Sequence, residues 1–129
     1  MPAQRVLIVE DDEPIREVMR IILEDAGYVV DAAAEGVAAL AQLRASSDHM
    51  IVVTDLLMPG MGGEALLRTA VADADLATRH AYLMVAAKSS LPPAVVELLE
   101  QLHASYVHKP FNIDELLAAV AEARARLAR

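Results

Sequence analysis

The strongest constraint on the fold is an alternation, repeated five times, of a short apolar run and an amphipathic segment. The apolar runs cover 5–9, 28–32, 50–55, 81–87 and 104–109. The segments that follow, with apolar residues at helical spacing, cover 12–27, 36–46, 63–73, 91–102 and 112–129. Short continuous apolar runs indicate strands that are covered on both faces. The predicted fold class is therefore α/β, a (βα)5 doubly wound five-stranded parallel sheet with helices on both faces.

Five units are too few for an eight-stranded barrel. We therefore expect an open, flavodoxin-like sheet with strand order 2-1-3-4-5, whose sites lie at the carboxyl ends of the strands. No linker or low-complexity stretch divides residues 1–129, so a single domain is expected. The stretch 72–81 is polar and is interpreted as a loop.

Several helix ends carry recognisable signals. Pro14 suits a first helical turn and Gly27 a left-handed stop. Asn112 has capping-box spacing to Glu115, and Ser90 is interpreted as the cap of the helix at 91–102. The turn after that helix, 102–105, reads LHAS and contains no glycine.

Composition excludes several function classes. The net charge of −8 argues against direct nucleic-acid binding and against anionic membranes. The chain has no cysteine, and no apolar run approaches the ~20 residues of a membrane span. We expect a cytoplasmic protein. The four histidines show no metal-ligand spacing and are interpreted as loop or surface residues: His49, His80, His103 and His108.

Charged residues gather where the predicted strands end. Glu10 and Asp11 follow the first strand, Asp55 ends the third, and Lys109 ends the fifth. Strands 1 and 3 are neighbours in the predicted order, so these carboxylates should converge with the lysine beside them. Clustered carboxylates repel one another unless a cation neutralises them, and oxygen ligands suit Mg²⁺. This pattern favours phosphoryl transfer, with Asp55 as the nucleophile and Lys109 contacting the phosphoryl group.

Three stretches, VLIVEDDEPIRE, VVTDLLMPGMGG and YVHKPF, carry a family resemblance. Together, in this order and on a (βα)5 pattern, they resemble the signature blocks of the receiver domain of bacterial two-component response regulators. The resemblance extends over essentially the whole chain. It implies a phosphoacceptor signalling domain that receives a phosphoryl group from a histidine kinase or a histidine phosphotransfer protein. Such a domain catalyses only its own phosphorylation and dephosphorylation and is not a conventional enzyme.

The resemblance also implies roles for individual residues. Asp55 is similar to the phosphoacceptor, and Lys109 to the lysine that contacts the phosphoryl group through a typically cis Lys109–Pro110 peptide. Mg²⁺ would be bound by Asp11 directly, by Glu10 mainly through water, by Asp55 and by the backbone carbonyl of Leu57. A register shifted by one residue would replace Asp11 with Asp12.

Two positions concern the conformational switch that follows phosphorylation in the family. Tyr106 resembles the aromatic switch residue of the family, although a purely packed strand residue fits it equally well. Ala86 stands where the family usually has a Thr or Ser whose hydroxyl bonds the phosphoryl oxygen. A hydrogen bond of this kind to a charged group contributes roughly 1.5–3 kcal/mol, and alanine cannot form it. We therefore expect weak or altered coupling to Tyr106.

Two other functions compete with the phosphoacceptor. A pseudo-receiver would bind a partner without phosphorylation, and Ala86 favours it. A metal-dependent phosphatase would need an acid two residues after Asp55, where Leu57 stands. The resemblance implies an output partner on the face formed by the fourth helix, fifth strand and fifth helix of the predicted units, and it leaves room for a homodimer. The sequence identifies neither the kinase nor the output partner.

Overall fold

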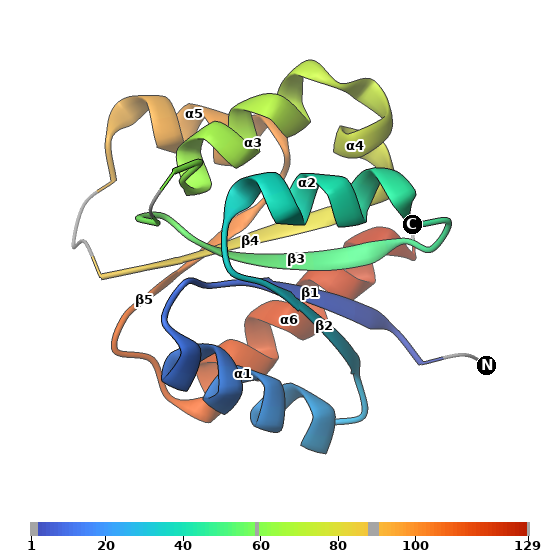
Figure 1. Cartoon of the computed structure of the whole chain (residues 1–129), viewed down its shortest axis with the longest axis vertical. Coiled ribbons are helices and arrows are strands. Elements are labelled where there is room, and N and C mark those ends of the chain that lie inside the picture. The colour runs from blue at the N-terminus through green and yellow to red at the C-terminus, as the bar shows by residue number, and fades with distance from the viewer. Residues whose placement is uncertain (1–2, 59, 88–90, 129) are drawn as a thin grey trace.

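The protein folds around a five-stranded parallel sheet with strand order β2-β1-β3-β4-β5 (Figure 1). The computed structural model describes residues 3–58, 60–87 and 91–128. The strands are β1 Arg5–Val9, β2 Val29–Ala33, β3 Met50–Asp55, β4 Ala81–Ala86 and β5 Ser105–His108. The helices are α1 Glu13–Asp25, α2 Gly36–Ala45, α3 Gly63–Ala72, α4 Ala74–Arg79, α5 Pro93–Gln101 and α6 Ile113–Leu127. The predicted fold class and strand order are confirmed.

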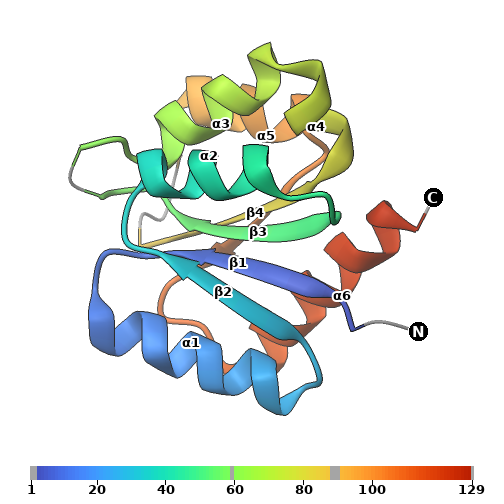
Figure 2. The ribbon, with the colours of Figure 1, turned by 45° about the vertical axis from the view of Figure 1, so that its right-hand side comes forward.

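Helices cover both faces of the sheet. α1 and α6 lie on one face, and α2 to α5 lie on the other (Figures 1 and 2). Along β1, Leu7 and Val9 pack in the cluster shared with α2, α3 and α5, whereas Val6 and Ile8 pack in the cluster shared with α1 and α6. Because successive side chains of a strand point to opposite faces, a strand covered on both faces needs a continuous apolar sequence.

The ends of α1 match their sequence signals. The Asp12 side chain caps the helix by accepting a hydrogen bond from the Ile15 N–H at 3.0 Å, and a proline occupies the first turn. At the other end Gly27 has φ +97°, and the N–H groups of Gly27 and Tyr28 bond to the carbonyls of Glu24 and Leu23. This pair of bonds is a Schellman motif, which stops the helix and turns the chain into β2.

α5 ends in the same motif without a glycine. His103 takes the left-handed conformation, φ +54°, and donates to the Glu100 carbonyl, while the Ala104 N–H bonds to the Leu99 carbonyl. The missing glycine in the 102–105 turn therefore does not remove the left-handed cap. Histidine occupies this conformation at a cost that glycine would not incur.

The expectation of a loop over 72–81 is wrong, because α4 lies inside this stretch. Asp73 caps α4 by accepting hydrogen bonds from the N–H groups of Asp75 and Leu76. Leu76 is buried, and its carbonyl accepts a hydrogen bond from the Tyr82 hydroxyl at 2.8 Å. A six-residue helix with one buried apolar side chain shows no helical repeat in the sequence.

Other predicted boundaries shift by a few residues. β2 begins and ends one residue later than predicted, β4 ends at Ala86, and β5 is limited to Ser105–His108. α5 begins at Pro93 with Pro92 in the cap position and no side-chain cap bond. The predicted cap residue, Ser90, lies outside the described residues. Asn112 caps α6 as expected, accepting from the Glu115 N–H at 2.8 Å.

The interpretation of the histidines is wrong for His80, which is 4 % exposed. Its Nδ1 accepts a hydrogen bond from the Met50 N–H at 3.0 Å, so the ring ties the start of β4 to the start of β3. Burial lowers the pKa of His80, and the neighbouring Arg79 charge lowers it further. His80 is therefore a neutral structural residue of the core.

Candidate functional site

Three carboxylates meet at the carboxyl ends of β1 and β3. Pairing of Val9 with Thr54 in adjacent parallel strands brings the next residues, Glu10 and Asp55, side by side. One carboxylate oxygen from each of Glu10, Asp11 and Asp55 lies within 4.8 Å of the other two. The predicted convergence of these residues is therefore present in the structure. We call Glu10, Asp11 and Asp55 the acidic cluster.

Lys109 reaches the acidic cluster from the end of β5. Its Nζ lies 3.2 Å from Glu10 Oε1 and 3.5 Å from Asp55 Oδ2. The Lys109 N–H donates to the Ala86 carbonyl at 2.8 Å, and the Lys109–Pro110 peptide is cis, as the resemblance implies. The ammonium group therefore lies between two carboxylates that come from different strands.

Glu10 is the most constrained member of the cluster. Burial, and after it the hydrogen bond to Asp55 and the negative charge of Asp55, raise the pKa of Glu10 to about 7, while Lys109 acts in the opposite direction. Glu10 is 2 % exposed, and its Oε2 has no hydrogen-bond donor among the described residues. Two facing carboxyl groups can share a hydrogen bond only when one of them carries a proton. Without a further cation, the pair therefore favours binding a proton.

The donor set fits a hard divalent cation. All three side chains offer carboxylate oxygens, and the buried Oε2 of Glu10 faces no donor of the described chain. Mg²⁺ prefers oxygen ligands and is commonly held by one or two carboxylates together with water. These residues therefore fit a magnesium site, and a bound cation would stabilise the charged form of Glu10 against the burial and the Asp55 charge that raise its pKa.

Asp12 has a different role from its neighbour Asp11. Its Oδ1 is occupied in capping α1, and the residue is exposed. Asp11 contributes to the acidic cluster. This arrangement supports the sequence register in which Asp11, rather than Asp12, faces the site.

The loop after Asp55 is closed by backbone contacts. The Leu56 N–H donates to Asp55 Oδ1 at 2.9 Å, which fixes the carboxylate. The Gly63 N–H donates to the Leu56 carbonyl at 2.9 Å, and a Cβ on Gly63 would lie only 2.9 Å from Leu56 Cα. The glycine therefore allows α3 to begin directly against the end of β3. Leu57 lies in this loop with its side chain exposed.

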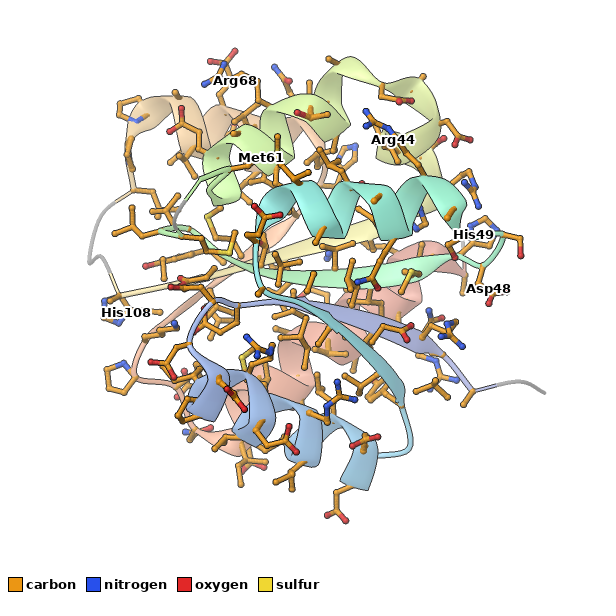
Figure 3. The ribbon with its side chains drawn as sticks, in the orientation of Figure 1. Arg44, Asp48, His49, Met61, Arg68 and His108 are labelled. Atoms are coloured by element: carbon orange, nitrogen blue, oxygen red, sulfur yellow. The ribbon has the colours of Figure 1, made fainter. Side chains whose placement is uncertain are left out.

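Ala86 and Tyr106 are linked through a backbone atom. Ala86 is buried and offers no hydroxyl, but its carbonyl accepts from the Tyr106 hydroxyl at 3.3 Å as well as from the Lys109 N–H. Tyr106 is half-buried, packs against the core, and meets the His108 ring edge-on at 6.4 Å; His108 is labelled in Figure 3. The residues that follow β4, Lys88, Ser89 and Ser90, lie outside the described part of the chain.

Arg16 is not among the residues predicted from the motifs, although it contacts the site. Its guanidinium donates to the Glu10 carbonyl at 2.7 Å from the first turns of α1. The bond fixes the backbone that carries Glu10 and Asp11. An arginine on an exposed helix face gives no sequence signal for such a backbone contact.

Comparisons with known proteins agree with this geometry. A family model described as the response regulator receiver domain matches residues 6–121. The chain therefore belongs to the response regulator receiver domain family, whose members are signalling modules rather than conventional enzymes. The acidic cluster is consistent with the phosphoacceptor site of this family.

Curated relatives are longer than this chain. The DNA-binding response regulator MtrA of Mycobacterium tuberculosis is 33 % identical over 126 residues, which cover 98 % of this chain and 51 % of MtrA. The C4-dicarboxylate transport transcriptional regulatory protein DctD of Rhizobium meliloti is 35 % identical over 128 residues, which cover 97 % of this chain and 26 % of DctD. The chain thus spans about half, or less, of the length of these relatives.

Solved structures show the same fold. A CheY-like response regulator receiver domain protein from Methanospirillum hungatei superposes with a TM-score of 0.82 at 28 % identity, covering 98 % of each chain. A response regulator from Chloroflexus aurantiacus gives a TM-score of 0.78 at 31 % identity, covering 99 % of this chain and 100 % of that one.

Within the described ranges, no helix is both long and apolar enough to cross a membrane.

Proposed function

We propose that Asp55 accepts a phosphoryl group, with Mg²⁺, from a histidine kinase or a histidine phosphotransfer protein, and that phosphorylation alters partner binding. The observation that carries the proposal is the acidic cluster with the Lys109 ammonium 3.5 Å from Asp55 Oδ2. A carboxylate nucleophile, a cation site and a positioned lysine are the groups that phosphoryl transfer requires.

The chain's own residues have separate tasks in this reaction. An Asp55 carboxylate oxygen forms the new bond to phosphorus while the bond from phosphorus to the donor imidazole nitrogen breaks, and the electron pair stays on that nitrogen. The Leu56 N–H holds the other carboxylate oxygen in place. Lys109 is near enough to take a phosphoryl oxygen. Mg²⁺, held by Glu10, Asp11, Asp55 and the Leu57 carbonyl, would neutralise charge on the transferred group.

The donor protein needs a surface beside Asp55, and α1 offers one. Val18 and Ile21 on α1 are 55 % and 59 % exposed, and Ile113 at the start of α6 is 56 % exposed. These side chains line one groove together with Phe111. The groove lies between α1, which begins three residues after Glu10, and the segment that follows Lys109. An amphipathic helix of a phosphodonor could bury these apolar groups while its phosphohistidine reaches the acidic cluster.

We propose that the output partner binds the face formed by α5, β5 and α6, away from the groove beside α1. The face formed by α5, β5 and α6 contains Tyr106, whose hydroxyl contacts the carbonyl of Ala86. A change at the site can therefore reach this face through residues 86 and 109. An output partner, an output domain or a second copy of the chain would bind there.

Ala86 supports a second candidate function, a pseudo-receiver that binds its partner without phosphorylation. The buried methyl group of Ala86 cannot donate a hydrogen bond to a phosphoryl oxygen. In this case the acidic cluster would remain unmodified. The two functions differ in one chemical event, the covalent modification of Asp55.

Intact mass separates the two candidates. The folded protein is incubated with Mg²⁺ and acetyl phosphate, a donor that needs no docking surface, and Asp55→Asn serves as the control. A gain of one phosphoryl group that requires Mg²⁺ and is lost in the variant supports the phosphoacceptor. No gain, together with no Mg²⁺ binding, would leave the pseudo-receiver.

A further inference from the structure

The loop between β3 and α3 is held at two separate places. At its base, the Gly63 N–H bonds to the Leu56 carbonyl. Near its tip, the Gly36 N–H donates to the Met61 carbonyl at 3.1 Å. Figure 3 labels Met61 near the amino-terminal end of α2. The second contact comes from the turn between β2 and α2, more than twenty residues earlier in the sequence.

The contact between Gly36 and Met61 is so close that no side chain fits at position 36. A Cβ at this position would lie 2.6 Å from Met61 Cγ and 2.7 Å from the Met61 carbonyl oxygen. Gly36 is not in the left-handed region, where the glycines with positive φ are Gly27 and Gly60. Alanine is therefore compatible with the backbone conformation of Gly36, and what excludes it is the approach of the loop.

Glu35 lies beside the same contact. Its Oε1 caps α2 by accepting from the Ala38 N–H at 2.8 Å. Its Oε2 lies against Gly60, 3.5 Å from the place that a Cβ would occupy there. One carboxylate thus caps the start of α2 and lies beside the loop. We call Glu35 and Gly36 the bracket turn.

We propose that the bracket turn positions the β3–α3 loop for cation binding, so that Glu35 and Gly36 are positioning residues of the phosphorylation site. The loop carries Leu57, whose carbonyl is a proposed Mg²⁺ ligand, and it starts at Asp55. A metal ligand on a loop requires support from residues outside the first coordination shell. This inference rests on the proposed function, because it assigns the bracket turn a task in Mg²⁺ binding.

Gly36→Ala tests the inference, with Val37→Ala as the matched control. Val37 is the next residue of the same helical turn and is 58 % exposed, so its truncation leaves the loop contact intact. Glu35→Asp is the second variant. Aspartate is a preferred N-cap residue and preserves the start of α2, but its shorter side chain withdraws from Gly60. Backbone amide NMR spectra report the loop, and calorimetric titration with Mg²⁺ reports the site.

Gly36→Ala should shift the loop amides of residues 56–58 and 60–62 and weaken Mg²⁺ binding about 10-fold or more, the size of effect seen when supporting residues of metal sites are changed. Glu35→Asp should act in the same direction, and Val37→Ala should match the wild type. Unchanged loop amides or unchanged Mg²⁺ affinity in Gly36→Ala and Glu35→Asp would overturn the inference. If the wild-type protein binds no Mg²⁺, the proposed function is overturned instead. The amide shifts of the loop can be measured without Mg²⁺, so they test the loop contact independently of the proposed function.

Discussion

The carboxyl group of Glu10 is buried at the end of β1 and faces the carboxylate of Asp55. Its pKa is raised to about 7, first by burial and then by Asp55. A proton would therefore compete with the proposed Mg²⁺ for this group near neutral pH. The cation site is predicted to be pH-sensitive for this reason.

Mg²⁺ affinity should fall about 10-fold between about pH 8 and about pH 6, because Glu10 binds a proton across this range in the metal-free protein. Calorimetric titration at the two pH values measures the change. Glu10→Gln should bind Mg²⁺ more weakly and with little pH dependence. Equal wild-type affinity at both pH values would contradict this role of Glu10.

The pKa of His80 is shifted in the opposite direction to that of Glu10, and this shift makes folding stability depend on pH. Its pKa is lowered in the folded state by burial, then by Arg79 and by His49, while Asp75 and a backbone contact with Leu43 act the other way. The unfolded chain then binds a proton at a higher pH than the folded chain does. Stability from His80 is complete above the unfolded pKa and is lost as pH falls below it.

Urea unfolding in EDTA at about pH 7.5 and about pH 5.5 isolates this effect, since unperturbed histidine titrates between these values. His80→Gln should lose less stability than the wild type on acidification. His108→Gln is the control, because His108 is exposed and is not among the groups that shift the His80 pKa. The prediction fails if all three proteins lose the same free energy of unfolding.

At the scale of the elements, the helix ends show what sequence signals can and cannot reveal. Pro14, Gly27 and Asn112 were predicted as helix-end residues, and each occupies that position. These signals are local, since one residue type satisfies neighbouring backbone groups. α4 could not be predicted in this way because its helical conformation depends on docking one residue, Leu76, into the core.

His103→Gly should raise the free energy of unfolding by about 0.5–1 kcal/mol. Glycine removes the cost of a left-handed residue, about 1–2 kcal/mol, and part of this gain is offset by its greater freedom in the unfolded chain. Urea denaturation of the wild type and the variant measures the difference. His103→Ala is the control and should bring no such gain, because alanine retains the Cβ. A destabilised glycine variant would show that the imidazole makes a contribution larger than the conformational cost.

At the scale of the whole molecule, the parallel sheet assembles the site. The order β2-β1-β3-β4-β5 places the ends of β1 and β3 together and brings Lys109 from β5. This convergence was predictable because strand period and order follow from local apolar patterns and short connections. The contacts of Arg16 with Glu10 and of Gly36 with Met61 were not predictable, since each depends on how two turns meet in space.

The residue at position 86 should control how strongly phosphorylation of Asp55 affects Tyr106, a property that depends on the whole molecule. Ala86→Thr adds a hydroxyl that can bond a phosphoryl oxygen, and such a bond is worth roughly 1.5–3 kcal/mol. After phosphorylation, the threonine variant should show larger amide shifts across α5 and β5 than the wild type, as measured by NMR. Ala86→Val matches threonine in shape without the hydroxyl and should resemble the wild type. Equal shifts in the threonine and valine variants would rule out this explanation.

Chemical trapping of the modified residue tests directly whether Asp55 is the phosphoacceptor. The protein is incubated with acetyl phosphate and Mg²⁺ and then treated with borohydride, which reduces an aspartyl phosphate to homoserine. Peptide mass spectrometry then locates the altered side chain. We expect homoserine at position 55 alone, with none when Mg²⁺ is omitted. Homoserine at Asp11 or Asp12 instead of position 55, or no reduced residue in a folded, Mg²⁺-bound protein, would contradict it.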